Sequence, residues 1–208
     1  AELNGRGLRL PFECISRADT LDESIADTLA EMGCWRLWIG SESGSQRVLD
    51  AMQREVQVEQ VQHMTRTLQK RGIQVGMFIM LGYEGETAAD LAETVRHLKT
   101  ARPDTFLTTV AYPIKGTPYY NQLAEQGRVR APAAGENAAW ELRSDRDLQV
   151  AGRYSGRFYR FATRWMTSSV NLSREWGGPR RPLQLAKSAA SAGLGRLGMA
   201  LTERERSV

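Results

Sequence analysis

Short apolar runs alternate with longer amphipathic runs four times in succession over the first part of the chain. The short runs are typical of strands, and the longer ones show the spacing of helices. Because strands that alternate with helices pair in parallel, the pattern predicts an α/β fold. Four strands are too few for an eight-stranded barrel of about 250 residues, so the sequence predicts either a small open sheet or part of a larger barrel. The predicted strands cover 8–16, 35–40, 73–81 and 105–112.

Several helix ends can also be placed from local signals. Thr20 and Glu23 have the spacing of a capping box, and Thr87 is a suitable N-cap residue. Pro118 suits a first helical position, and Gly33 is typical of a helix end. Further helices are predicted at roughly 45–54, 58–71, 145–168 and 182–201.

The charge of the chain is uneven. Residues 1–127 carry 13 Lys+Arg and 17 Asp+Glu, a net of −4, whereas residues 128–208 carry 15 and 7, a net of +8. We interpret residues 1–130 as the α/β part and residues 131–208 as a basic helical extension that packs on it. The positive charge of the extension is compatible with a peripheral membrane contact. The absence of a run of consecutive basic residues argues against a nucleic-acid partner.

The ends and the cysteines bear on where the protein works. The chain begins with Ala1 rather than Met, so we expect a processed product or, preferably, a fragment. No signal region opens it, and no apolar run approaches the length of about 18 residues that a membrane span requires. Cys14 and Cys34 are too few for a disulfide scaffold, so we expect a cytoplasmic, reducing compartment.

A carboxylate and several hydroxyls follow the predicted strand at 35–40. In α/β proteins, ligands bind at the carboxyl ends of the strands, so this loop is a candidate site. The alternative is that one of the serines only caps the next helix. The polar residues of the loop are Ser41, Glu42, Ser43 and Ser45.

Four other titratable residues suggest structural roles. Glu84 and Glu86 precede a helix, where negative charge is favourable, and we interpret them as support for that loop. His63 and His97 occupy polar positions of helical patterns, and we expect both to face solvent.

Three segments, in the right order, resemble radical SAM enzymes. Residues 39–49 are similar to the fourth-strand segment of that family, residues 78–87 to the fifth, and residues 112–118 to the exit of the sixth. Residues 157–161 resemble the cobalamin-dependent branch related to anaerobic magnesium-protoporphyrin ester cyclase. The resemblance implies the third to sixth strands of a (β/α)₆ partial TIM barrel, followed by a helical extension.

The family's cofactors are S-adenosylmethionine (SAM) and a [4Fe–4S] cluster. The cluster motif Cys-x₃-Cys-x₂-Cys is absent, and Cys14 and Cys34 cannot supply three thiolates. The resemblance therefore implies cluster ligands outside this chain, no metal ligand within it, and a cobalamin domain, if there is one, further upstream. By itself, the chain is expected to be inactive.

The resemblance also implies SAM-binding residues. Glu42 would accept hydrogen bonds from the ribose or amino group, and Arg54, with Arg17 as a second candidate, would bind the carboxylate bidentately. Both cations could instead be ordinary surface charges. Gly82 would let the backbone approach adenine. The implied cofactor-binding residues are Arg17, Ser41, Glu42, Ser43, Arg54, Gly82 and Tyr112.

Taken together, the sequence predicts a fragment of a radical SAM enzyme. The family cleaves SAM to a 5′-deoxyadenosyl radical, and this branch implies methylation or oxidative cyclisation of a small-molecule substrate such as a lipid, tetrapyrrole or natural product. A reductant such as ferredoxin or flavodoxin would be a partner. The alternative is a non-catalytic α/β binding or scaffold module whose basic tail contacts a membrane or nucleic-acid surface.

Overall fold

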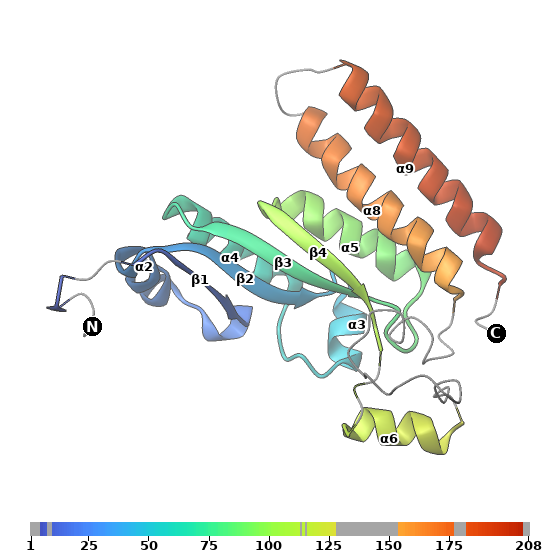
Figure 1. Ribbon diagram of the computed structural model, residues 1–208, viewed down its shortest axis with the longest axis horizontal. Coiled ribbons are helices and arrows are strands. Elements are labelled where there is room, and N and C mark those ends of the chain that lie inside the picture. The colour runs from blue at the N-terminus through green and yellow to red at the C-terminus, as the bar shows by residue number, and fades with distance from the viewer. Residues whose placement is uncertain are drawn as a thin grey trace, which may run out of the picture.

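A computed structural model describes residues 5–7, 10–112, 114, 116–127, 154–176 and 182–205. Four parallel strands form one sheet in the order β1-β2-β3-β4 (Figure 1). The strands are β1 (Phe12–Ser16), β2 (Cys34–Glu42), β3 (Gln74–Leu81) and β4 (Thr105–Val110). The helices are η1 (Ala18–Thr20), α2 (Glu23–Met32), α3 (Gln46–Ala51), α4 (Val58–Lys70), α5 (Ala88–Ala101), α6 (Pro118–Glu125), α8 (Gly156–Trp176) and α9 (Pro182–Thr202). The predicted α/β fold with a parallel sheet is confirmed.

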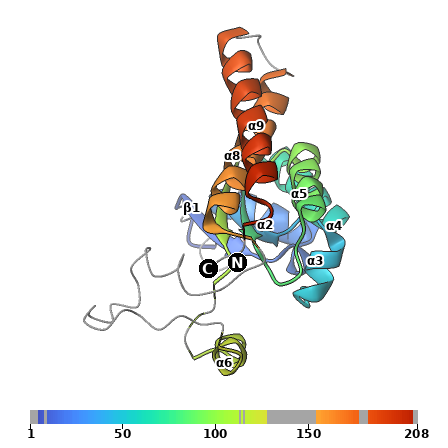
Figure 2. The same cartoon turned by 90° about the vertical axis from the view of Figure 1, so that its right-hand side faces the viewer.

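Helices α4 and α5 lie on one side of the sheet (Figure 2). The side chains that point toward them are fully buried, because every second residue of a strand faces the same layer. They include Leu37, Ile39, Val75, Met77, Ile79 and Leu81. The other face, which we call the open face, carries side chains that remain accessible. Ile15 is 71% exposed there and Leu107 is 53% exposed.

An aromatic pair lies on the open face. The rings of Trp38 and Phe78 stack, with their centroids 4.9 Å apart. Trp38 also donates from Nε1 to Glu13 on β1 over 3.1 Å. Its ring covers Gly76, where an added Cβ would lie 2.4 Å from Trp38 Cε3. A glycine is therefore needed on β3 for the indole to lie flat across three strands.

Strand β2 runs two residues further than the sequence predicted. The register shifts at its end, because Gly40 pairs with Phe78 whereas Glu42 pairs with Ile79. Two steps on β2 thus match one step on β3, which is the geometry of a bulge. Ser41 and Glu42 are therefore part of the strand's irregular end rather than of a free loop.

Helices α8 and α9 form a hairpin beside α5 (Figure 1). Phe158, Ala162 and Met166 of α8 are fully buried and belong to the same hydrophobic cluster as the sheet. Gly198 of α9 lies against Phe161, where an added Cβ would stand 2.3 Å from the ring. The prediction for 182–201 is confirmed. Helix α8 runs beyond the predicted end at 168 because Val170 continues its buried face.

Two predictions concerning this region fall on residues outside the described ranges. They are the start of the extension at residue 131 and the first part of the helix predicted at 145–168. The boundary near residue 130 between the α/β part and the extension therefore stays a prediction.

Most predicted helix ends are confirmed. Thr87 caps α5 in a reciprocal capping box with Asp90, and Gly33 ends α2 with φ +94°. The capping box predicted at Thr20 is wrong, because Asp22 caps α2 by accepting from Ile25 N over 2.8 Å. Thr20 instead ends the short helix η1, where its hydroxyl donates to the Arg17 carbonyl.

Candidate functional site

An ion pair lies over the carboxyl end of β2. Glu42 Oε1 is 3.2 Å from Arg54 Nη2, and the same nitrogen donates to the Gly40 carbonyl over 3.3 Å. An added Cβ at Gly40 would lie 3.0 Å from the Glu42 carboxylate and 3.1 Å from Arg54 Nη2. The missing side chain at Gly40 thus provides the space in which the two charged groups meet.

The backbone that presents this pair is strained. Glu42 has φ +58°, and Gln53 and Glu55, on either side of Arg54, have φ +54° and +52°. Each non-glycine residue in this left-handed region costs on the order of 1 kcal/mol. Such conformations persist only where surrounding contacts hold them, and they often mark functional sites.

Arg17 supplies one of these contacts. Its Nη2 donates to the Arg54 carbonyl over 2.8 Å. The same guanidinium donates two hydrogen bonds to Asp19, from Nε over 2.9 Å and from Nη2 over 2.7 Å. The structure therefore brings the two predicted cations together. Arg17 holds the backbone of Arg54, whereas the Arg54 guanidinium is the one that pairs with Glu42.

The Glu42–Arg54 pair has hydrogen-bonding groups that a ligand could still engage. Burial raises the pKa of Glu42, while the Arg54 charge opposes that rise. Arg54 Nε is buried and has no hydrogen-bond partner among the described residues. A buried N–H without an acceptor costs about 1–3 kcal/mol, so an acceptor at this position would be stabilising. A bound carboxylate is one group that could supply it.

Three serines of the β2 exit point to the opposite side, toward α5. Ser41 Oγ lies 3.0 Å from His97 Nε2, Ser43 Oγ lies 3.2 Å from Thr94 Oγ1, and Ser45 donates to Asp90 over 2.7 Å. We call these six residues the serine seam. Because they are all buried, the structure does not bring the predicted cofactor residues Ser41 and Ser43 to the Glu42 pair.

The periodicities of a strand end and a helix explain the serine seam. Asp90, Thr94 and His97 are spaced four and three residues apart, which places them on one face of α5. Gly44 lets the two backbones approach, since an added Cβ would lie 2.4 Å from His97 Cβ and 2.6 Å from Thr94 Cα. Arg47 extends the contact with an ion pair of 2.5 Å to Asp90.

The expectation that His97 faces solvent is wrong. His97 is 2% exposed, and burial lowers its pKa to about 4. Its second nitrogen, Nδ1, lies 3.3 Å from Gln62 Nε2. The sequence did contain a signal for this burial, because His97 lies next to Leu98 and one helical turn after Thr94. His63 is exposed, as predicted.

The exit of β3 is held by Glu86. Gly82, with φ +79°, donates its backbone N–H to Glu86 Oε2 over 2.5 Å. Glu86 is 2% exposed, and burial raises its pKa to about 7. Its loop-supporting role is confirmed, and the Gly82 N–H is already engaged. Sequence analysis missed Tyr159, whose ring carbon Cζ would lie 2.9 Å from a Cβ at Gly82.

The remaining residues to place are Tyr112, which was predicted to bind cofactor, and the two cysteines. Tyr112 follows the end of β4 and is partly buried. Cys14 and Cys34 are free thiols whose sulfurs lie 3.9 Å apart. No group of three or more His, Cys, Asp or Glu side chains that could hold a metal ion occurs in the described part of the chain. Two thiols do not fit the [4Fe–4S] cluster of radical SAM enzymes, which takes three protein thiolates.

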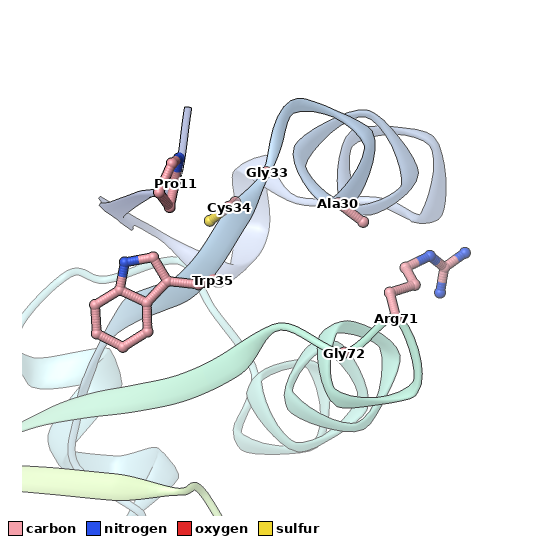
Figure 3. A pocket seen from close by; sticks show the side chains of 7 residues that line it. All are labelled: Pro11, Ala30, Gly33, Cys34, Trp35, Arg71 and Gly72. Carbon is pink, nitrogen blue, oxygen red and sulfur yellow. The ribbon is translucent and has the colours of Figure 1, made fainter. Parts of the chain in front are cut away.

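A hollow of ≈ 360 Å³ opens at the other end of the sheet (Figure 3). Its lining includes Trp35 at the start of β2, and Arg71, which pairs with Asp27 over 2.6 Å. The hollow lies at the amino ends of the strands, whereas parallel α/β sheets bind ligands at the carboxyl ends. We therefore place the candidate site at Glu42 and Arg54.

Within the described helices, none is long and apolar enough to cross a membrane.

A protein family and a relative from another organism are similar to this chain. Residues 2–98 match the model of the radical SAM superfamily. An uncharacterized methyltransferase of Pyrococcus horikoshii is 30% identical over 112 residues, which are 53% of this chain and 24% of the relative. The chain thus spans about a quarter of the length of that relative.

Two solved structures share the fold. The radical SAM methyltransferase TsrM of Kitasatospora setae, with cobalamin and a [4Fe–4S] cluster bound, aligns with a TM-score of 0.51 at 24% identity. The alignment covers 61% of this chain and 24% of TsrM. An N-terminally truncated Elp3 of Methanocaldococcus infernus aligns with a TM-score of 0.53 at 17% identity and covers 76% and 32%.

The matched residues, slightly less than half of the chain, contain β1 to β3. The sheet is parallel with helices α4 and α5 on one side, so the fold is of the α/β class and the chain is similar to the radical SAM superfamily over these residues. The segments at 39–49 and 78–87 lie within the matched residues, so their resemblance to the radical SAM superfamily is confirmed, whereas the segment at 112–118 lies outside the match.

Proposed function

We propose that this chain is part of a radical SAM enzyme and forms one wall of its SAM site. Enzymes of this superfamily cleave SAM reductively to a 5′-deoxyadenosyl radical. The two thiols of the chain do not fit the cluster that supplies the electron, so the proposal places the cluster ligands outside this chain. The residues described below would bind and orient SAM, which is the part of the task that they can perform.

The observation that carries the proposal is the Glu42–Arg54 pair with its unused donor. The methionine end of SAM bears an ammonium and a carboxylate on one carbon. Glu42 offers an acceptor for the ammonium, and Arg54 offers Nε, which is buried without a partner in the described structure. A guanidinium binds a carboxylate through two parallel N–H groups, which suits Arg54 better than a lysine.

The surroundings favour binding of a zwitterion. Burial raises the pKa of Glu42, so a bound ammonium would stabilise its ionised form. Arg17 donates to the carbonyl of Arg54, and Gly40 leaves the room in which Glu42 and Arg54 meet. Because these groups are already positioned, binding requires little reorganisation of side chains.

We propose a small-molecule substrate, and methylation or oxidative cyclisation as the outcome. The methyltransferase relative at 30% identity supports a methyl transfer. Lipids, tetrapyrroles and natural products are the substrate classes that the resemblance implies, with ferredoxin or flavodoxin as the reductant. Cobalamin is a narrower proposal, supported by the tail at 157–161 and by its presence in TsrM, which shares the fold.

Isothermal titration of SAM into the full-length, cluster-containing protein tests the site. Glu42→Gln and Arg54→Lys should each weaken binding by roughly 1–3 kcal/mol, which is about ten- to more than a hundredfold in Kd. Glu84→Gln, on the exit loop of β3, and Arg71→Lys, at the far end of the sheet, are the matched controls.

The outcomes separate two failures. Equal, small effects in all four variants would show that SAM binds elsewhere on the protein. Absence of SAM binding by the cluster-containing wild type would refute the proposed function itself. Cluster content and circular dichroism must match between variants, so that a lost cluster or fold is not mistaken for a lost contact.

A further inference from the structure

Helix α9 presents an apolar surface to solvent that the proposed chemistry does not use. Its exposed leucines are Leu183 (71%), Leu194 (54%), Leu197 (57%) and Leu201 (72%). Their spacing of eleven, three and four residues places all four on one side of the helix. The opposite side packs on α8 through Gly195, Gly198 and Met199. The leucines therefore form a stripe, which we call the leucine stripe, that faces away from the hairpin's own core.

The surface beside the leucine stripe is also apolar. The exposed residues on the next side of the helix are small, at Ala186, Ala189, Gly193 and Ala200. Between its first and last residues α9 carries two charged side chains, Lys187 and Arg196, and both are positive. An exposed helix of 21 residues with so few charges is not adapted to water alone.

The charge around the leucine stripe indicates what covers it. The described part of the hairpin, residues 154–176 and 182–205, carries seven Lys+Arg and three Asp+Glu, a net of +4. Exposed basic residues include Arg160, Lys187 and Arg204. A second copy of this hairpin would bring the same positive charge to the contact. A surface with an apolar interior and anionic groups at its boundary matches both properties.

We propose that α9 lies in the boundary of an anionic lipid bilayer, with the leucine stripe inserted among the acyl chains. Helix α9 is about 30 Å long at 1.5 Å per residue. Lys187 lies within the leucine stripe and can extend its ammonium to the lipid phosphates while its stem stays in apolar surroundings. The helix would bind along the bilayer and not across it.

The hairpin would bring the membrane next to the candidate site. Arg157 at the start of α8 pairs with Glu205, just beyond the end of α9, over 2.9 Å. Tyr159 on the same turn of α8 contacts Gly82 at the carboxyl end of β3. The end of α9 that carries Leu201 therefore lies on the side of the molecule where the strands end (Figure 1). The binding proposal does not depend on the SAM chemistry.

Flotation of the full chain with lipid vesicles tests this inference. We expect binding to vesicles that contain one quarter phosphatidylserine, with at least tenfold weaker binding to pure phosphatidylcholine. The Leu194→Ser/Leu201→Ser double variant should lose at least tenfold in vesicle affinity. Leu107→Ser, on the open face at a similar exposure of 53%, is the matched control and should bind like the wild type.

Two further measurements complete the test. Lys187→Gln and Arg160→Gln should weaken binding to the anionic vesicles and reduce its dependence on salt. Sedimentation velocity without lipid detects a second copy as occupant. The proposal is overturned if wild type does not bind vesicles, if the double variant binds as well as wild type, or if the leucine stripe only mediates a dimer. All substituted side chains are exposed, so circular dichroism should show unchanged folding.

Discussion

The Ser41 hydroxyl lies 3.0 Å from Nε2 of His97, and both side chains are buried. This contact joins the end of β2 to helix α5, 56 positions further along the chain. With Ser41 fixed against the helix, the bulge and the left-handed backbone at Glu42 direct the Glu42 side chain toward Arg54. The serine seam thus positions the ion pair without taking part in it.

The first prediction concerns His97. Its pKa falls from 6.5 to about 4 on burial, so the folded state binds fewer protons than the unfolded state between these values. The stability tied to neutral His97 should therefore be present above about pH 6.5 and be lost as the pH falls toward 4, by up to about 3 kcal/mol. Urea unfolding of wild type and His97→Gln across this range measures the difference, with exposed His63→Gln as the control. A constant difference between wild type and His97→Gln would contradict the prediction.

Glu86 should have the opposite pH dependence. Its pKa rises from 4.5 to about 7, so the folded state holds a proton that the unfolded state has released. The associated stability is present below about pH 4.5 and is lost as the pH rises through 7, by up to roughly 3 kcal/mol. Glu86→Gln retains an acceptor for the Gly82 N–H without the charge.

The Glu86→Gln variant should consequently gain stability over wild type at about pH 8 and match it at about pH 4.5. Glu84→Gln, an exposed change on the same loop, is the control. Because Glu86 and His97 change the free energy of unfolding in opposite directions as the pH rises, the pH dependence of wild-type stability alone cannot separate their contributions. A Glu86→Gln variant that is less stable than wild type at the higher pH would contradict this assignment.

Substitution of Gly44 should be costly. In Gly44→Ala the new methyl would meet the backbone of α5, with Thr94 Cα at 2.6 Å and the Glu93 carbonyl at 2.9 Å. Neither atom can rotate away, so we expect a loss of about 1–3 kcal/mol in the free energy of unfolding. Gly193→Ala, at a helical position with open space, should instead be neutral or stabilise by up to about 1 kcal/mol. Denaturant midpoints of the two variants compare them, and equal effects would show that the strand end can move away from α5.

Arg17 should act on SAM through Arg54. Arg17→Gln removes the donor to the Arg54 carbonyl, so we expect roughly a three- to tenfold rise in the Kd for SAM in the full-length protein, or about 0.7–1.4 kcal/mol. Asp19→Asn removes the charge partner of Arg17 and keeps that hydrogen bond, and it should change the Kd less. If Asp19→Asn weakens binding as much as Arg17→Gln, the ion pair with Asp19 and not the contact to Arg54 is what matters.

Local patterns predicted the framework of this protein. The alternation of Leu37 and Ile39 predicted a strand, and α4 and α9 were each predicted within a few residues of their observed bounds. Thr87 and Gly33 marked helix ends through their own side-chain chemistry and backbone freedom. These signals are read within a few residues of sequence, because strand period, helix period and capping depend on near neighbours.

Contacts between distant residues could not be predicted this way. The sequence itself determined the strands and helices, the polar composition of the β2 exit, the basic extension and the shortage of thiols for a cluster. Tertiary structure alone decided that Glu42 faces Arg54 while Ser41 faces His97, and that Tyr159 covers Gly82. The physical reason is that burial and pairing depend on which surfaces meet when the helices pack on the sheet. A bulge between Gly40 and Glu42 decides which way a side chain at the strand end points.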